Sequence, residues 1–140
     1  MPALVNTYVR FNSITASTDG KDIPDSIKNW KLEEYHHVAN ETLELIYCSL
    51  EDYFEDKNII DADVEENVFL QINTTEGTYF INKQPPNKQI WLSSPLSGPK
   101  RYDYLNGQWI CLRDNDKFHD LLLDEMHTIF GKDFQFPEKF

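Results

Sequence analysis

Apolar residues recur every three or four positions in two stretches of the chain. This spacing predicts amphipathic α-helices, because a repeat near 3.6 residues keeps side chains on one face. The first stripe consists of Leu32, Tyr35, Ala39, Leu43, Ile46, Leu50 and Phe54. The second consists of Phe118, Leu121, Leu122, Met126 and Ile129. Asp114, Asn115 and Asp116 are candidate N-cap residues for the second helix, and Gly131 is placed to end it.

Between the two helices the apolar period changes to two, which is the repeat of a β-strand. The pattern predicts strands near residues 68–72, 77–82, 89–92, 101–104 and 108–112. Asn106-Gly107 is the strongest hairpin signal in the chain. Short links make the sheet antiparallel, and both helix stripes need one sheet face. We therefore expect an α+β fold, a two-layer sandwich with two helices on one face of an antiparallel β-sheet and the other face open.

The 140 residues are most simply one domain, over residues 30–140, after a flexible N-terminal extension over residues 1–29. The first 18 residues contain no acid and one arginine, with many serine, threonine and asparagine residues. This composition fits either the end of a mitochondrial transit peptide or a plain disordered extension. No apolar run approaches the roughly 18 residues needed to span a membrane.

Negative charge is concentrated in one part of the chain. Twelve carboxylates and one lysine lie between Glu33 and Glu66, and the rest of the chain has 12 acidic and 12 basic residues. We call these twelve carboxylates the acidic ridge. It attracts hard cations or a basic protein surface, although a solvated helix face is the simpler interpretation. A net charge of −11 disfavours nucleic acids and anionic membranes as partners.

Alternation along the strands also predicts what faces outward. If Ile81, Ile90, Leu92 and Tyr102 point to the core, then Asn82, Gln89, Trp91 and Arg101 point to the open face. A tryptophan among amides and an arginine is typical of an interface hot spot. We expect Trp109, in contrast, to be buried. His119 and His127 are expected at the surface, and Cys48 and Cys111 are expected to be free thiols that are packed or semi-buried.

The sequence contains no standard catalytic constellation. It lacks a nucleophile with a base, a phosphate-binding loop and a Rossmann glycine pattern. The two cysteines form no CxxC pair, so they indicate neither a zinc site nor a disulfide framework. The acidic ridge lacks the spacing of an EF-hand, so a tight cation site is not expected.

One long segment resembles a known family. The run INKQPPNKQIWLSSPLSGPKRYD, residues 81–103, is similar to the signature of frataxins, and the resemblance extends over roughly residues 32–130. It implies a fungal mitochondrial frataxin located in the mitochondrial matrix. It also implies weak binding of iron, as Fe(II) or Fe(III), and docking on the complex of cysteine desulfurase and iron–sulfur scaffold protein. Some fungal members of the family are described as iron-driven homo-oligomers with ferroxidase and iron-storage activity, so enzymatic activity stays an open alternative.

The resemblance also implies site residues. The iron ligands would be Glu41, Glu44, Glu51, Asp52, Glu55, Asp63 and Glu65. The docking residues would be Asn82, Lys83, Gln84, Asn87, Lys88, Gln89, Trp91 and Arg101. Val38, Asn40 and Cys48 stand where close fungal relatives have acids, which thins the acidic ridge. We therefore expect weaker iron-driven assembly, with Cys48 as a neutral replacement rather than an iron ligand.

Overall fold

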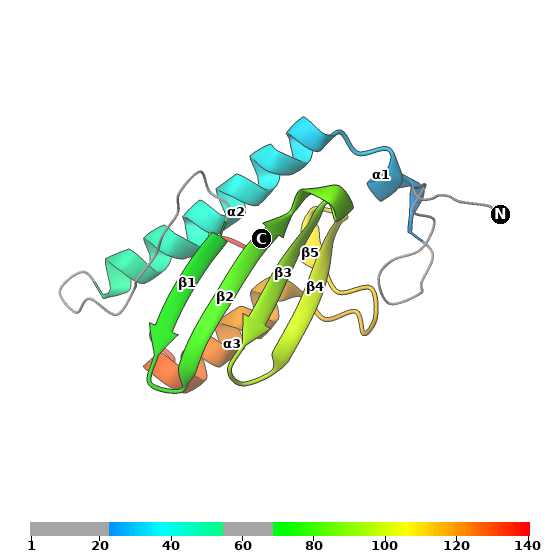
Figure 1. Cartoon of the computed structure of the whole chain (residues 1–140). Coiled ribbons are helices and arrows are strands. Elements are labelled where there is room, and N and C mark those ends of the chain that lie inside the picture. Colours follow the sequence, from blue (N-terminus) through cyan, green and yellow to red (C-terminus); the bar gives the residue numbers. More distant parts are fainter. Residues whose placement is uncertain (1–22, 55–68) are drawn as a thin grey trace.

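The computed structural model describes residues 23–54 and 69–140. Figure 1 shows a sheet in front of two long helices. The elements in chain order are α1 (Asp25–Lys28), α2 (Leu32–Tyr53), β1 (Phe69–Thr74), β2 (Gly77–Gln84), the 3-10 helix η2 (Pro85–Asn87), β3 (Gln89–Ser94), β4 (Gly98–Leu105), β5 (Gln108–Ile110) and α3 (Phe118–Phe130). The five strands pair antiparallel in their chain order. The predicted α+β sandwich is therefore confirmed.

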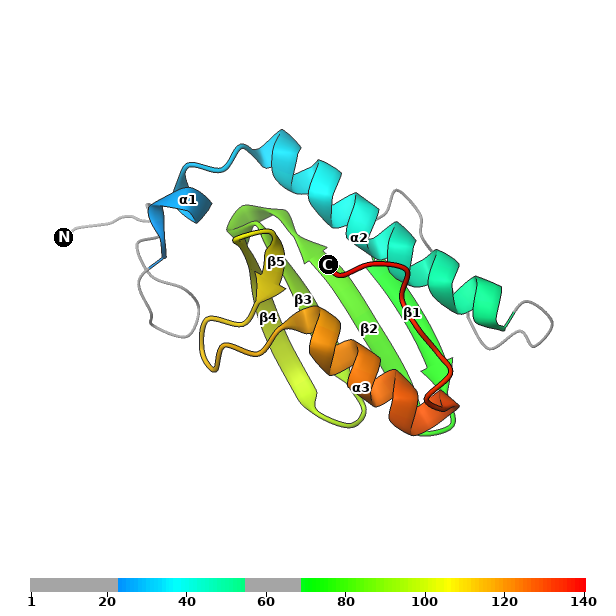
Figure 2. The same ribbon diagram turned by 180° about the vertical axis from the view of Figure 1, so that it is seen from behind.

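Both long helices cover the same face of the sheet, which we call the inner face (Figure 2). The opposite side, the outer face, carries neither α2 nor α3 (Figure 1). The inner face is lined by buried side chains from all five strands, including Leu70, Ile72, Tyr79, Ile81, Ile90, Leu92, Tyr102 and Trp109. The expected alternation is thus confirmed, and these side chains form one hydrophobic core with the two helix stripes.

The first helix stripe is buried except at its start. Tyr35, Ala39, Leu43, Ile46 and Leu50 are fully buried, whereas Leu32 is 49% exposed. Placing Leu32 in the core was wrong. Helical side chains lean toward the N-terminus, and Leu32 is the first residue of α2, so its side chain leans past the helix end.

The predicted hairpin between β4 and β5 is confirmed. Asn106 and Gly107 both have positive φ angles, 54° and 78°, as a two-residue type I′ turn requires. This turn sets the register that places Tyr104 opposite Trp109. Trp109 is fully buried, and its Nε1 donates a hydrogen bond to Thr42 Oγ1 at 2.9 Å.

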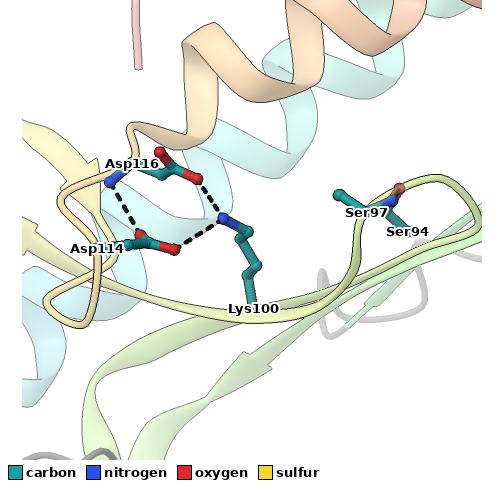
Figure 3. Close-up of polar contacts among 5 residues, drawn as sticks. All are labelled: Ser94, Ser97, Lys100, Asp114 and Asp116. Carbon is teal, nitrogen blue, oxygen red and sulfur yellow. Dashed lines mark hydrogen bonds and ion pairs between the residues drawn. The ribbon is translucent and has the colours of Figure 1, made fainter.

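The start of α3 differs from the prediction, while its end agrees. Gly131 follows the last helical residue with a φ of 122°, as expected of a helix stop. The residue before the helix, however, is Lys117, and no side chain caps the helix. Asp114 and Asp116 instead bind the Lys100 amine from β4, with Lys100 Nζ 3.0 Å from Asp114 Oδ2 (Figure 3). The acidic turn before α3 therefore fastens β4 rather than capping the helix.

The C-terminal tail completes the core. Figure 2 shows it running back between α2 and α3 over the inner face. Phe134, Phe136 and Phe140 are buried there. His119 lies beneath this tail, with its ring centroid 5.6 Å from that of Phe136 and 4.8 Å from that of Phe140. His119 is 7% exposed, so the expectation of a surface histidine was wrong.

Part of the expected flexible extension has regular structure. Residues 25–28 form α1, and Ile27 is only 4% exposed. Lys88 Nζ donates to the carbonyl oxygens of Ile27 and Lys28 at 3.5 and 3.4 Å. Residues 1–22 lie outside the described part of the chain, so the domain boundary near residue 29 stays a prediction.

Candidate functional site

The described part of the acidic ridge lies on α2. The helix carries six carboxylates and neither lysine nor arginine. All six side chains, Glu33, Glu34, Glu41, Glu44, Glu51 and Asp52, belong to exposed residues. Four of the predicted iron ligands are among them. The other three, Glu55, Asp63 and Glu65, lie outside the described residues.

Two of these carboxylates contact neighbours on the same helix. Tyr47 donates its hydroxyl to Glu51 Oε2 at 2.9 Å. His37 Nε2 lies 3.5 Å from Glu41 Oε2. Both pairs are four residues apart, the spacing at which helical side chains meet. Because α2 itself offers no lysine or arginine, the negative charge of its six carboxylates is not balanced within the helix.

Cys48 interrupts the ridge. It is exposed, contrary to the expectation of a packed or semi-buried thiol, whereas Cys111 is buried as expected. Partial burial and the carboxylates of Glu44, Glu51 and Asp52 raise the pKa of the Cys48 thiol. Cys48 therefore stays a neutral thiol at neutral pH, which makes it a poor metal ligand, because the thiolate is the binding form. This supports its interpretation as a neutral replacement.

The described part of the ridge, on α2, is not a preformed metal centre. Within residues 23–54 and 69–140, no group of three or more His, Cys, Asp or Glu side chains is gathered closely enough to hold an ion. Exposed single carboxylates can each supply one or two oxygen ligands and leave the remaining positions of a hard cation to water. Such an arrangement gives weak and rapidly exchanging binding that salt weakens further.

The second candidate site is a row of residues across the middle of the outer face. Asn82 on β2 pairs with Trp91 on β3, which pairs with Arg101 on β4. Trp91 is half-buried and Arg101 is exposed. The Arg101 Cζ atom lies 4.8 Å from the centre of the Trp91 ring, a cation–π contact. An aromatic ring flanked by an arginine and an amide on an open sheet face can anchor a protein partner.

Two of the eight predicted docking residues do not lie open to a partner. Lys83 is on the inner face and 8% exposed, with its amine 2.6 Å from Asn40 Oδ1 and 3.0 Å from His36 Nδ1. Successive side chains of β2 point to opposite faces of the sheet, so Lys83 lies on the same face as Ile81, which is the face that α2 covers. Gln89 is on the outer face but only 3% exposed. The expectation that Gln89 is open to solvent was wrong, and a docking role for either residue stays a prediction.

The turn between β2 and β3 carries the other three predicted residues, Gln84, Asn87 and Lys88, all of them partly buried. Tyr35 of α2 fastens this turn at both ends. Its hydroxyl donates to the Gln89 carbonyl at 2.6 Å and accepts from the Gln84 amide at 3.0 Å. Lys88 adopts a left-handed backbone conformation with φ 53°. The helix thus holds the turn beside the outer face.

The outer face also contains residues that we did not include in the site. Phe80, 40% exposed, is two residues before Asn82 on β2, and the register places it opposite Ser93. Asp103 is two residues after Arg101 on β4 and pairs with Gln89. The period of two assigns both to the outer face, so the signal was present in the sequence. Only the structure shows that Asp103 is buried, at 3% exposure.

Comparison with known proteins agrees with this fold. The sequence pattern of the frataxin-like domain matches residues 28–132. The chain is 43% identical to the mitochondrial frataxin homolog of Saccharomyces cerevisiae over 130 residues, which are 91% of this chain and 74% of the relative. It is 42% identical to mitochondrial frataxin of Caenorhabditis elegans over 141 residues, covering 93% and 94% of the two chains.

Solved structures give the same result. A structure of yeast frataxin superposes with a TM-score of 0.61 at 42% identity, covering 86% of this chain and 99% of the other. A trimeric yeast frataxin complexed with ferrous iron has a TM-score of 0.58 at 42% identity, with 76% and 96% covered. The fold and its acidic helix define an α+β sandwich of the frataxin-like class. The chain belongs to the frataxin family, and, like the relatives named above, it is mitochondrial.

No helix within the described residues is long and apolar enough to cross a membrane.

Proposed function

We propose that the protein is an iron-binding regulator of iron–sulfur cluster assembly in the mitochondrial matrix. Iron is the cargo of the acidic ridge, and the outer face docks on the complex of cysteine desulfurase and scaffold protein. Membership of the family supports an iron-related function. The observation that carries the proposal is the yeast relative complexed with ferrous iron, together with six exposed carboxylates on α2 that no lysine or arginine of that helix balances.

The chemistry of the ridge fits iron held as cargo. Carboxylate oxygens are hard ligands that accept Fe(II) and Fe(III), and an exposed helix surface leaves water on the ion. The repeating charge gives several overlapping weak positions instead of one tight site. Iron bound in this way can be passed on, because each carboxylate contributes little and exchange is fast.

The outer face supports the docking part of the proposal. Trp91 offers a large apolar ring, and Arg101 and Asn82 offer polar groups on either side of it. In protein interfaces, tryptophan and arginine are enriched among the few residues that carry most of the binding energy. The described part of the acidic ridge lies on α2 and the outer face belongs to the sheet, so iron and a partner can be bound at the same time.

An iron titration followed by NMR tests the iron part. Fe(II) is expected to broaden the amide signals of residues 41–55 and 61–66 and to leave those of β3 and β4 unchanged. Added salt is expected to weaken the effect, because exposed charges are screened within about 10 Å at 0.1 M salt. Broadening centred on His119 or His127 would contradict the proposal.

A second candidate function is that of a ferroxidase and iron-storage protein acting as iron-driven oligomers. The observation that favours it is that two of the yeast frataxin structures are trimers, one of them complexed with ferrous iron. Assembly and oxygen consumption during iron addition distinguish this function from that of a regulator. The corresponding prediction is made below at the scale of the whole molecule.

A further inference from the structure

We infer that Gln89 and Asp103 are positioning residues that fix the orientation of the Trp91 indole on the outer face. The inference rests on the proposed docking function, in which Trp91 touches the partner. It gives a role to two buried polar side chains that cannot serve as direct contacts. It also makes the docking tryptophan a preorganised group rather than a freely rotating one.

Two hydrogen bonds connect the three side chains in a line. The Trp91 indole Nε1 donates to Gln89 Oε1 at 2.7 Å. The Gln89 amide Nε2 donates in turn to Asp103 Oδ2 at 3.1 Å. The register explains the geometry, since Gln89 stands opposite Asp103 and Trp91 stands opposite Arg101 in the next outward-facing pair.

The chemistry of the three groups allows only one direction for this line. An ionised carboxylate only accepts hydrogen bonds, and an indole nitrogen only donates them. The amide between them must therefore turn its NH₂ group to Asp103 and its oxygen to Trp91. Arg101 then lies over the face of the ring, 4.8 Å from its centre. The indole is held at its edge by Gln89 and contacted on its face by Arg101.

Burial separates the positioning residues from the contact residues. Gln89 and Asp103 are each 3% exposed, whereas Trp91 is half-buried and Arg101 is exposed. A partner on the outer face would reach the tryptophan and the arginine, but not the pair beneath. Any effect of the buried pair on docking must therefore pass through Trp91. Holding a large side chain in its bound orientation lowers the entropy lost on association.

The free protein provides the first test, which does not depend on docking. Gln89→Met keeps the length of the side chain but removes its oxygen and NH₂ group. Asp103→Asn lets residue 103 donate as well as accept, so only the indole N–H still fixes the orientation of the Gln89 amide. In both variants the indole Nε1–H resonance of Trp91 is expected to shift, and its exchange with water is expected to accelerate.

A matched control separates this effect from general destabilisation. Ile72→Val removes one methylene from the inner face of β1 and touches none of the three side chains. It should lower the melting temperature while leaving the indole resonance unchanged. Asp103 makes at least one other interaction, so Gln89→Met is the decisive variant. An unchanged indole resonance in Gln89→Met would overturn the inference.

Docking is the second test. Binding of Gln89→Met to the desulfurase–scaffold complex should weaken about three- to tenfold, the cost of ordering one large side chain at an interface. In a Trp91→Phe background, which has no indole N–H, Gln89→Met should have no further effect. Equal losses in both backgrounds would overturn the inference. Unchanged binding of Trp91→Ala would instead overturn the proposed docking function. The indole resonance of the free protein would then still test whether Gln89 and Asp103 fix the orientation of Trp91.

Discussion

At the scale of single residues, two tryptophans of one sheet have different roles. Trp109 on β5 is fully buried on the inner face beside α2, while Trp91 on β3 lies on the outer face. Trp109→Ala is expected to lower the free energy of unfolding by roughly 3–5 kcal/mol, as for other large aromatic residues in cores. Trp91→Ala should barely change it but should reduce activation of the desulfurase complex. Urea denaturation and an activity assay of both variants check this prediction. A large loss of stability in Trp91→Ala would show that Trp91 is a core residue.

His119 predicts a dependence of stability on pH. Burial lowers the pKa of His119. The Asp120 carboxylate opposes this with a smaller increase, and the Lys139 amine adds a smaller decrease. Its Nδ1 atom is buried and has no hydrogen-bond partner among residues 23–54 and 69–140. In the unfolded chain the imidazole takes up a proton near pH 6.5. The unfolded state therefore binds more protons as pH falls below that value, and the folded state loses stability.

His119→Phe should reduce this loss, because phenylalanine does not titrate and suits the aromatic surroundings of Phe136 and Phe140. Urea denaturation at several pH values between 5 and 8 would measure it. His37→Gln is the control, since His37 is exposed on α2 and its removal should leave the pH dependence nearly as in the wild type. An equal decline in the His119→Phe variant would show that another group causes the effect.

At the scale of elements, α2 has an apolar stripe on one face and carboxylates that repel one another on the other. The sheet packs against this stripe, so packing stabilises the helix despite the like charges of Glu41 and Glu44 at i,i+3 spacing. Cys48 lies four residues from both Glu44 and Asp52. It therefore separates two groups of carboxylates that would otherwise form one continuous row.

Cys48→Glu should make the ridge continuous. The new carboxylate would meet like charges on both sides, and each such pair destabilises a helix by about 0.2–0.5 kcal/mol. We expect lower stability at low salt, recovery at high salt, and tighter iron binding. Cys48→Ser, which adds no charge, is the matched control. Iron titration and urea denaturation at two salt concentrations measure both effects, and unchanged iron binding in Cys48→Glu would show that ridge density does not set affinity.

At the scale of the whole molecule, charge limits self-association. The net charge of −11 makes two copies repel unless cations bridge them. Val38, Asn40 and Cys48 carry no negative charge on α2, so fewer bridges can form than if acids stood at these positions. We therefore expect a monomer at low iron and limited assembly at high iron and oxygen. Light scattering with an oxygen electrode during aerobic Fe(II) addition measures this. A large iron-loaded particle at modest iron excess, with oxygen consumed in step, would favour the ferroxidase and storage function.

The sequence by itself determined the features that depend on near neighbours. Helical stripes, strand alternation and the Asn106-Gly107 turn are set by steps of one to four residues, and the structure has all of them. Membership of the family follows from one contiguous run, and the charge of the ridge follows from composition. These properties need no knowledge of what lies across the molecule.

Only the tertiary structure decided which polar groups are buried. Lys83 and Gln89 are both close to Trp91 in sequence. The Lys83 side chain lies against α2, and the Gln89 side chain is hydrogen-bonded to Asp103 and Trp91. His119 is buried because a tail beginning twelve residues later returns over it. Asp114 and Asp116 bind Lys100 instead of capping α3. For Lys83, Gln89 and Lys100 the deciding contact joins residues 14 to 47 positions apart in the chain, and for His119 it is made by the returning tail. The spacing of apolar residues along the chain contains no information about such contacts.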